Sequence, residues 1–219
     1  MTKIDIDPYT KNSKEAIFRR LFHLFSFWYL IYYFMDDKVP IIELDKRIFA
    51  ILIVSSIIII EIFRIKYRYL FPGMRPYEAY QLGGYAWGAL GVLITLLFFP
   101  LRFAAPTLLG ISFIDPMIGI SRNYIKEKNQ SLSSFKKYLI YPSLPALCYF
   151  LIMFFSISLL SQHSITNSLV LSLSGTAAGL IAENINPEKY RFARVVDDDF
   201  RMQIAPLITL ASIEFILSF

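Results

Sequence analysis

The sequence predicts an all-α protein, a polytopic integral membrane helical bundle of about seven transmembrane helices with a cytoplasmic N-terminus. Three observations predict this class. The 219 residues are 56% hydrophobic and 16% aromatic, which leaves too few polar side chains to cover a soluble domain of this size. The apolar residues form runs near the length of a bilayer-spanning helix. The basic residues gather in alternate loops between these runs. We therefore expect residues 1–219 to form a single transmembrane domain.

Seven apolar runs are long enough, or nearly long enough, to cross a membrane as helices, which takes about 20 residues. The third, fifth and sixth runs contain no charged residue and are the clearest of the set. In chain order, the runs are Leu21–Met35, Ile48–Phe63, Leu82–Leu101, Phe103–Ile120, Tyr138–Leu160, Ile165–Ala182 and Met202–Phe219.

The loop charges predict which side of the membrane each loop occupies. Most of the 22 Lys and Arg residues lie in the N-terminal arm and in the loops after the second, fourth and sixth runs. Because basic loops stay in the cytoplasm, the arm (residues 1–18) and the acidic loop (residues 184–201) are predicted to be cytoplasmic. The same bias accounts for the net charge of +5, so we expect no nucleic-acid partner.

Ionisable side chains at the ends of the apolar runs are the candidate functional residues, because charge in a membrane is costly unless it is paired or used. Arg19, Arg20 and His23 open the first run, and Arg19 and His23 share a helix face at a spacing of four. The others, all near predicted cytoplasmic ends, are Glu61, Arg64, Asp115, Gly119, Arg122, Glu183, Asp197, Asp198 and Asp199.

These residue types point to phosphate chemistry beside a lipid. Clustered carboxylates bind Mg²⁺ while leaving positions for phosphate oxygens, and basic side chains bind phosphate directly. Each group also has a structural interpretation: interfacial anchors for the arginines, a surface ion pair for Glu61 and Arg64, a helix break at Asp115, and a solvated loop for the Asp triplet. Their convergence at the cytoplasmic interface favours a site where a water-soluble phosphate compound meets a membrane lipid.

The order of these residues resembles that of the CTP-dependent lipid-alcohol kinases, which include dolichol kinase, phytol kinase and the CTP-dependent diacylglycerol kinase. The family's Arg-Lys-x-x-His-like signature is similar to residues 19–23, with Arg in place of Lys. Its Glu-x-x-Arg is matched by Glu61 and Arg64, and its Gly-containing third span by residues 83–100. Its later Glu and Asp-Asp-Asn correspond to Glu183 and to residues 197–199.

The chain departs from the family at two places. The Gly-Asp-x-x-Ala segment corresponds only loosely to residues 114–118, where Ile114 replaces the glycine, and its Gly-Arg-x-x-Gly continuation is reduced to Gly119 and Arg122. The Lys-Ser/Thr…Gly-Ser element has no good counterpart in residues 129–137. The resemblance therefore predicts the fold more strongly than it predicts the nucleotide site.

The resemblance implies an integral membrane kinase that transfers the γ-phosphate of CTP to a polyprenol or other lipid alcohol. Its partners are then a nucleotide, a lipid alcohol and membrane lipids, and a homodimer is left open. It implies the plasma membrane in a prokaryote and the endoplasmic reticulum in a eukaryote. It implies that Asp115, Asp198 and His23 are catalytic and that Asp197, Asp198 and Asp199 hold Mg²⁺. The nucleotide-binding side chains implied are Arg19, Arg20, Glu61, Arg64, Gly119, Arg122 and Glu183.

Three alternatives stay open from the sequence. A cytidylyltransferase making a CDP-lipid needs similar groups, but the chain lacks that family's basic, Asp-Arg-x-Asp-like C-terminal signature. A transporter or channel is disfavoured because we find no internal repeat and no charge within the third, fifth and sixth runs. A catalytically inactive lipid-binding relative is kept open by the departures around Asp115.

Overall fold

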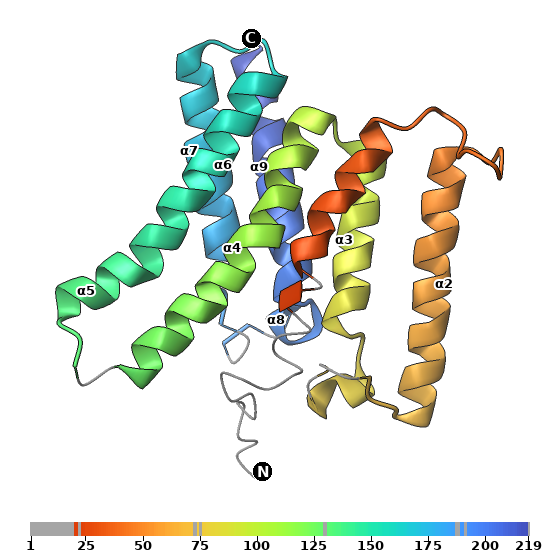
Figure 1. The fold of residues 1–219 in the computed structure, drawn as a ribbon, viewed down its shortest axis with the longest axis horizontal. Helices are drawn as coiled ribbons and strands as arrows, with labels where there is room; N and C mark the ends of the chain where they lie inside the picture. The colour runs from red at the N-terminus through yellow and green to blue at the C-terminus, as the bar shows by residue number, and fades with distance from the viewer. Residues whose placement is uncertain are drawn as a thin grey trace.

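The computed structural model describes residues 20–21, 23–71, 74, 76–128, 131–186, 189–190 and 192–218, and its named secondary-structure elements over these residues are all helices. Successive long segments alternate in direction, so the α2–α3, α4–α5 and α7–α9 connections share one end of the bundle (Figure 1). The elements are η1 (Phe25–Tyr33), α2 (Lys46–Tyr67), η2 (Pro76–Tyr80), α3 (Gly84–Phe98), α4 (Leu101–Glu127), α5 (Ser134–Tyr138), η3 (Leu139–Ser143), α6 (Leu144–Leu160), α7 (Ile165–Glu183), α8 (Phe192–Val195) and α9 (Asp198–Leu217).

Five helices in the described part of the chain are long and apolar enough to cross a membrane. They are Lys46–Tyr67, Leu101–Glu127, Ser134–Leu160, Ile165–Glu183 and Asp198–Leu217. This architecture fits the predicted helical membrane bundle, whereas the predicted count of seven is not confirmed.

Two predicted spans lie outside this set. The first comprises helical residues 20–21 and 23–24 followed by the nine-residue 3₁₀ helix η1. The third, α3, has 15 residues, because Gly83 is extended before it and Phe99 is extended after it. Phe99 precedes Pro100, and a residue before proline is pushed out of the helical conformation, so α3 ends there.

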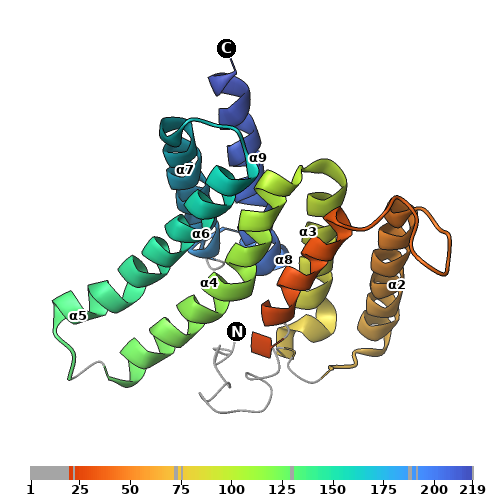
Figure 2. The ribbon, with the colours of Figure 1, turned by 45° about the horizontal axis from the view of Figure 1, so that its top comes forward.

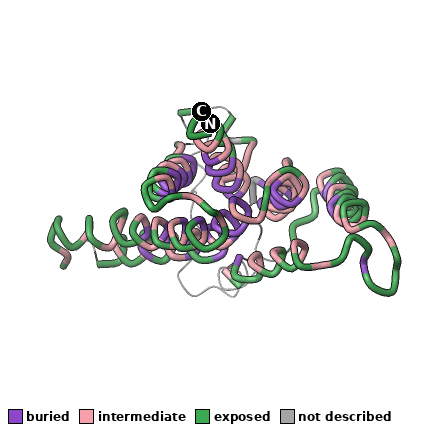
Figure 3. Tube along the Cα trace, turned by 90° about the horizontal axis from the view of Figure 1, so that it is seen from above, coloured by how far each residue is buried: buried purple, intermediate pink, exposed green. Residues whose placement is uncertain are grey.

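The hydrophobic core lies among α4, α6, α7 and α9, where the tube in Figure 3 shows buried residues near the middle. Helix α2 stands at the edge of the bundle, beside α3 and η2 (Figure 2). The buried residues of α2 are Val54, Glu61 and Arg64, and its exposed isoleucines suit contact with lipid. The core is formed by Phe103, Ile114, Ile118, Tyr149, Met153, Ile157, Leu171, Met202, Leu207 and Leu210.

Glycines let three core helices approach closely around one aromatic ring. Tyr149 of α6 is fully buried, and a Cβ added at Gly110 of α4 or at Gly179 of α7 would overlap its ring. Small residues at such positions are the usual means of close helix packing in membranes. The contact sets the separation of α4, α6 and α7, and α4 and α7 carry Asp115 and Glu183 toward the same end of the bundle.

We expect Gly179→Ala to destabilise the protein by about 1–3 kcal/mol, since an extra methyl group in a filled core forces its neighbours to shift. Gly88→Ala is the matched control, because a Cβ there meets nothing within 4 Å. The control should be neutral, or stabilising by up to about 1 kcal/mol through helix propensity. The check is the thermal unfolding midpoint in detergent, and equal midpoints for the two variants would contradict this packing.

Candidate functional site

The Asp triplet begins the last helix rather than lying in a loop. The side chain of Asp197 caps α9 and accepts a hydrogen bond from the backbone N–H of Asp199 at 3.1 Å, while Asp198 and Asp199 occupy the first turn. The last helix was predicted to start at Met202, but it starts at Asp198. The acidic loop, predicted to end at residue 201, therefore ends at Asp197. The physical reason is that carboxylates satisfy the unpaired N–H groups and the positive dipole end at a helix N-terminus.

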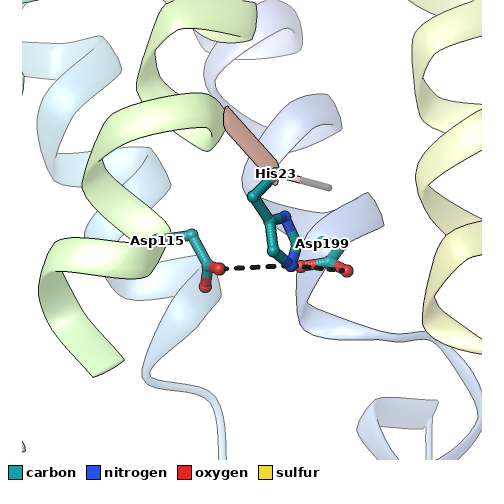
Figure 4. A group of neighbouring side chains, drawn as sticks. All are labelled: His23, Asp115 and Asp199. Atoms are coloured by element: carbon teal, nitrogen blue, oxygen red, sulfur yellow. Dashed lines mark ion pairs between the residues drawn. The ribbon is translucent and has the colours of Figure 1, made fainter. Parts of the chain in front are cut away.

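Four stretches far apart in the sequence meet at this point. His23, which precedes η1, lies with its Nε2 atom 3.5 Å from Asp115 Oδ2 of α4 and 3.9 Å from Asp199 Oδ2 of α9 (Figure 4). Glu183, the last residue of α7, joins Asp115 and Asp198 in a second group whose carboxylate oxygens lie within 4.8 Å of one another. The structure thus brings together His23, Asp115, Glu183, Asp198 and Asp199.

The cluster is largely shielded from water within the protein. His23, Glu183 and Asp199 are less than 9% exposed, and the side chain of Asp115 is 17% exposed. Carboxylates this close and this buried repel each other strongly unless positive charge offsets them. Their oxygens are hard donors of the kind that Mg²⁺ prefers, so the donor set fits a divalent cation.

Arg122 supplies part of the compensating charge from the rim of the cluster. Its Nη1 donates to Glu183 Oε1 at 2.8 Å, and its Nη2 donates to the hydroxyl of Tyr141 at 2.9 Å and to Asn184 Oδ1 at 3.0 Å. The Arg122 side chain is still 41% exposed, so the guanidinium can be reached from the end of the bundle. It can therefore hold Glu183 and face an incoming anion.

Glu61 and Arg64 form a separate buried network at the end of α2. Arg64 donates to both Glu61 carboxylate oxygens and to the backbone carbonyls of Tyr69, Glu78 and Gln81. Glu61 also accepts from the backbone N–H of Gly83 at 2.8 Å and from the hydroxyl of Tyr85. The pair therefore shapes the α2–α3 connection, and its role in nucleotide binding stays a prediction.

This network reaches the acidic cluster through the start of α3. Glu78 accepts from the backbone N–H of Gly84 at 3.1 Å. A Cβ added at Gly84 would lie 3.2 Å from Asp197 Oδ1 and 3.3 Å from Asp199 Oδ2, so any larger residue would push these carboxylates away by a few tenths of an ångström. The positive end of the α3 dipole thus lies against the carboxylates of α9.

Of the remaining predicted residues, Arg20 and Gly119 are described and Arg19 is not. Arg19 and the N-terminal arm lie outside the described residues. Arg20 is half-buried at the beginning of the described chain. A Cβ added at Gly119 would meet nothing within 4 Å, so no close neighbour requires glycine there.

Sequence reasoning missed several residues that shape the site. Tyr141 and Asn184 share the Arg122 guanidinium, and nothing local in the sequence marks either of them. The sequence placed Arg201 only among the basic residues of a cytoplasmic loop. In the structure it donates to the carbonyl of Ala182 at 2.7 Å and to the carbonyl of Asp197 at 3.4 Å, and these bonds tie α7 to α9. The adjacent Gly83 and Gly84 were the one usable signal for the close approach of α3.

Comparison of the chain with protein-family models, curated proteins and solved structures finds no match.

Replacing Glu61 with Gln tests the buried network. The substitution leaves the Arg64 guanidinium, whose side chain is 1% exposed, without its counter-charge. We expect a loss of about 3–5 kcal/mol in the free energy of unfolding, the usual effect of breaking a buried ion pair. Asp37→Asn is the control, because Asp37 is 97% exposed and pairs with Lys46 only at 3.6 Å, so its loss should cost less than about 1 kcal/mol. Denaturant titration in detergent measures both, and losses of similar size would exclude the structural role.

Proposed function

We propose that this protein is an integral membrane kinase that uses Mg²⁺ to transfer the γ-phosphate of CTP to a polyprenol or other lipid alcohol at the cytoplasmic interface. The observation that carries the proposal is the meeting of His23, Asp115, Glu183, Asp198 and Asp199 at one end of a bundle with candidate membrane-spanning helices. The preference for CTP and for a polyprenol comes from the sequence resemblance, whereas the geometry supports a cation and a phosphate.

The reaction needs positioning and charge neutralisation rather than a covalent nucleophile. The lipid hydroxyl oxygen forms a bond to the γ-phosphorus, the bond from that phosphorus to the β–γ bridging oxygen breaks, and CDP leaves. Asp115, beside His23, would help hold the nucleotide–metal complex, and the hydroxyl proton is lost to water as the phosphoryl group transfers. Arg122 would face the transferred phosphoryl group, and Mg²⁺, which Asp115, Glu183, Asp198 and Asp199 would hold, would neutralise charge on the phosphates.

The arrangement of charge favours a site at one end over a path through the membrane. Arg102, His163 and Glu214 form the other cluster we identify, with Arg102 Nε donating to Glu214 Oε1 at 2.9 Å. It lies at the opposite end of the bundle, at the start of α4 and the end of α9 (Figure 1). Between the two ends, the buried side chains of the described residues are apolar or uncharged polar, such as Ser172 and Thr176, and none of them carries a charge. A transporter is therefore disfavoured relative to an enzyme at the cytoplasmic end.

The test is a kinase assay on the purified full chain, with Mg²⁺, CTP labelled on its γ-phosphate and a panel of prenyl alcohols. We expect labelled lipid and free CDP. Asp115→Asn and Asp198→Asn should each lower kcat by on the order of 100-fold or more, because each removes several kcal/mol of transition-state stabilisation. Asp37→Asn, a substitution at the opposite end, should leave the rate unchanged.

Other results overturn the proposal in distinguishable ways. Release of pyrophosphate with a phosphorylated lipid as acceptor identifies a cytidylyltransferase. Absence of labelled lipid with every alcohol, together with no CTP binding by calorimetry, identifies an inactive relative. Full activity in Asp115→Asn and Asp198→Asn excludes the carboxylate cluster as the catalytic centre.

A further inference from the structure

The carboxylate cluster contains three overlapping sets of donors, one of which is the Asp197, Asp198 and Asp199 triplet itself. His23, Asp115 and Asp199 form the first set, and Asp115, Glu183 and Asp198 form the second. Asp115 belongs to both, and a carboxylate can offer one oxygen to each of two ions. Asp197 is engaged differently, because its side chain caps α9.

The separations around His23 suit ligands of one ion better than a direct hydrogen bond. Nε2 lies 3.5 Å from Asp115 Oδ2 and 3.9 Å from Asp199 Oδ2, and N–H···O hydrogen bonds span about 2.7–3.2 Å. With metal–ligand bonds of about 2.1 Å, adjacent ligands lie roughly 3.0–3.5 Å apart and opposite ligands roughly 4.2 Å apart. Figure 4 shows the imidazole placed between the two carboxylates.

Glu183 is an independent indication of a ligand in the second set. Its side chain is only 2% exposed, and its Oε1 accepts from Arg122. Its Oε2 is buried and has no hydrogen-bond partner among the described residues. A buried carboxylate oxygen without a donor is costly, and a cation among Asp115, Glu183 and Asp198 removes that cost.

We propose that the cluster is a two-cation site in which the Asp115 carboxylate bridges the ions. The position formed by Asp115, Glu183 and Asp198 is all oxygen and suits Mg²⁺. The position formed by His23, Asp115 and Asp199 contains an imidazole nitrogen and suits a first-row transition ion such as Mn²⁺ better than Mg²⁺. Two-metal sites hold their ions about 3.5–4 Å apart and clamp the attacking and leaving oxygens of a transferred phosphate. The inference deepens the proposed function and rests on it only for the catalytic use of the second ion.

The test is Mn²⁺ binding to the full chain in detergent, without nucleotide or lipid, measured by calorimetry and by electron paramagnetic resonance. We expect two Mn²⁺ per chain and a spin-coupled spectrum at saturation. An excess of Mg²⁺ should displace one of the two ions more readily than the other. His23→Gln should bind one Mn²⁺ and lose the coupling, whereas His163→Gln, at the opposite end, should still bind two.

Glu183→Gln is the second variant, and it should weaken the other position while the His23 position keeps its ion. Gel filtration and circular dichroism show which variants keep the fold. A single Mn²⁺ in the wild type, or two coupled ions in folded His23→Gln, overturns the proposal. Two coupled ions without any kinase product would contradict the proposed function and leave the two-cation site standing. Kinase activity with only one bound ion would contradict the His23 position and leave the proposed function standing.

Discussion

The mutual repulsion of carboxylates is the constraint on which the end of this bundle depends. Asp115, Glu183, Asp198 and Asp199 come from three helices and are held close together with little exposure to water. Such a group is stable only when positive charge surrounds it. The protein supplies Arg122 on one side and the positive end of the α3 dipole against α9. Under the proposed function, a divalent cation would add to that compensation.

The rest of the fold can be understood as the support that holds these groups in place. Tyr149, packed against Gly110 and Gly179, sets the distance between α4 and α7. Arg201 ties the end of α7 to the start of α9, so that Glu183 and the Asp triplet stay together. The Glu61–Arg64 pair supports the site indirectly. It holds the α2–α3 connection, which positions Gly84 beside the carboxylates of α9.

The sequence predicted the parts of this structure that follow from local pattern. Long apolar runs predicted α2, α4, α6, α7 and α9, and charge near their ends singled out His23, Asp115, Glu183 and the Asp triplet, which the structure places together. It was wrong about the start of α9, because three adjacent acids resemble a solvated loop unless helix capping is weighed. Tyr141 and Asn184 could not have been found, since their roles depend on how α6 and α7 pack against Arg122.

The central claim is that distant segments share one metal-binding centre, and iron-directed cleavage tests it most directly. Fe²⁺ is bound in place of Mg²⁺, ascorbate and peroxide generate hydroxyl radicals at the ion, and mass spectrometry maps the cuts. The account predicts cuts near residues 23, 115, 183 and 197–199, all suppressed by excess Mn²⁺. Cuts confined to residues 197–199 would show that the acids bind metal as a local helix start and that no shared centre exists.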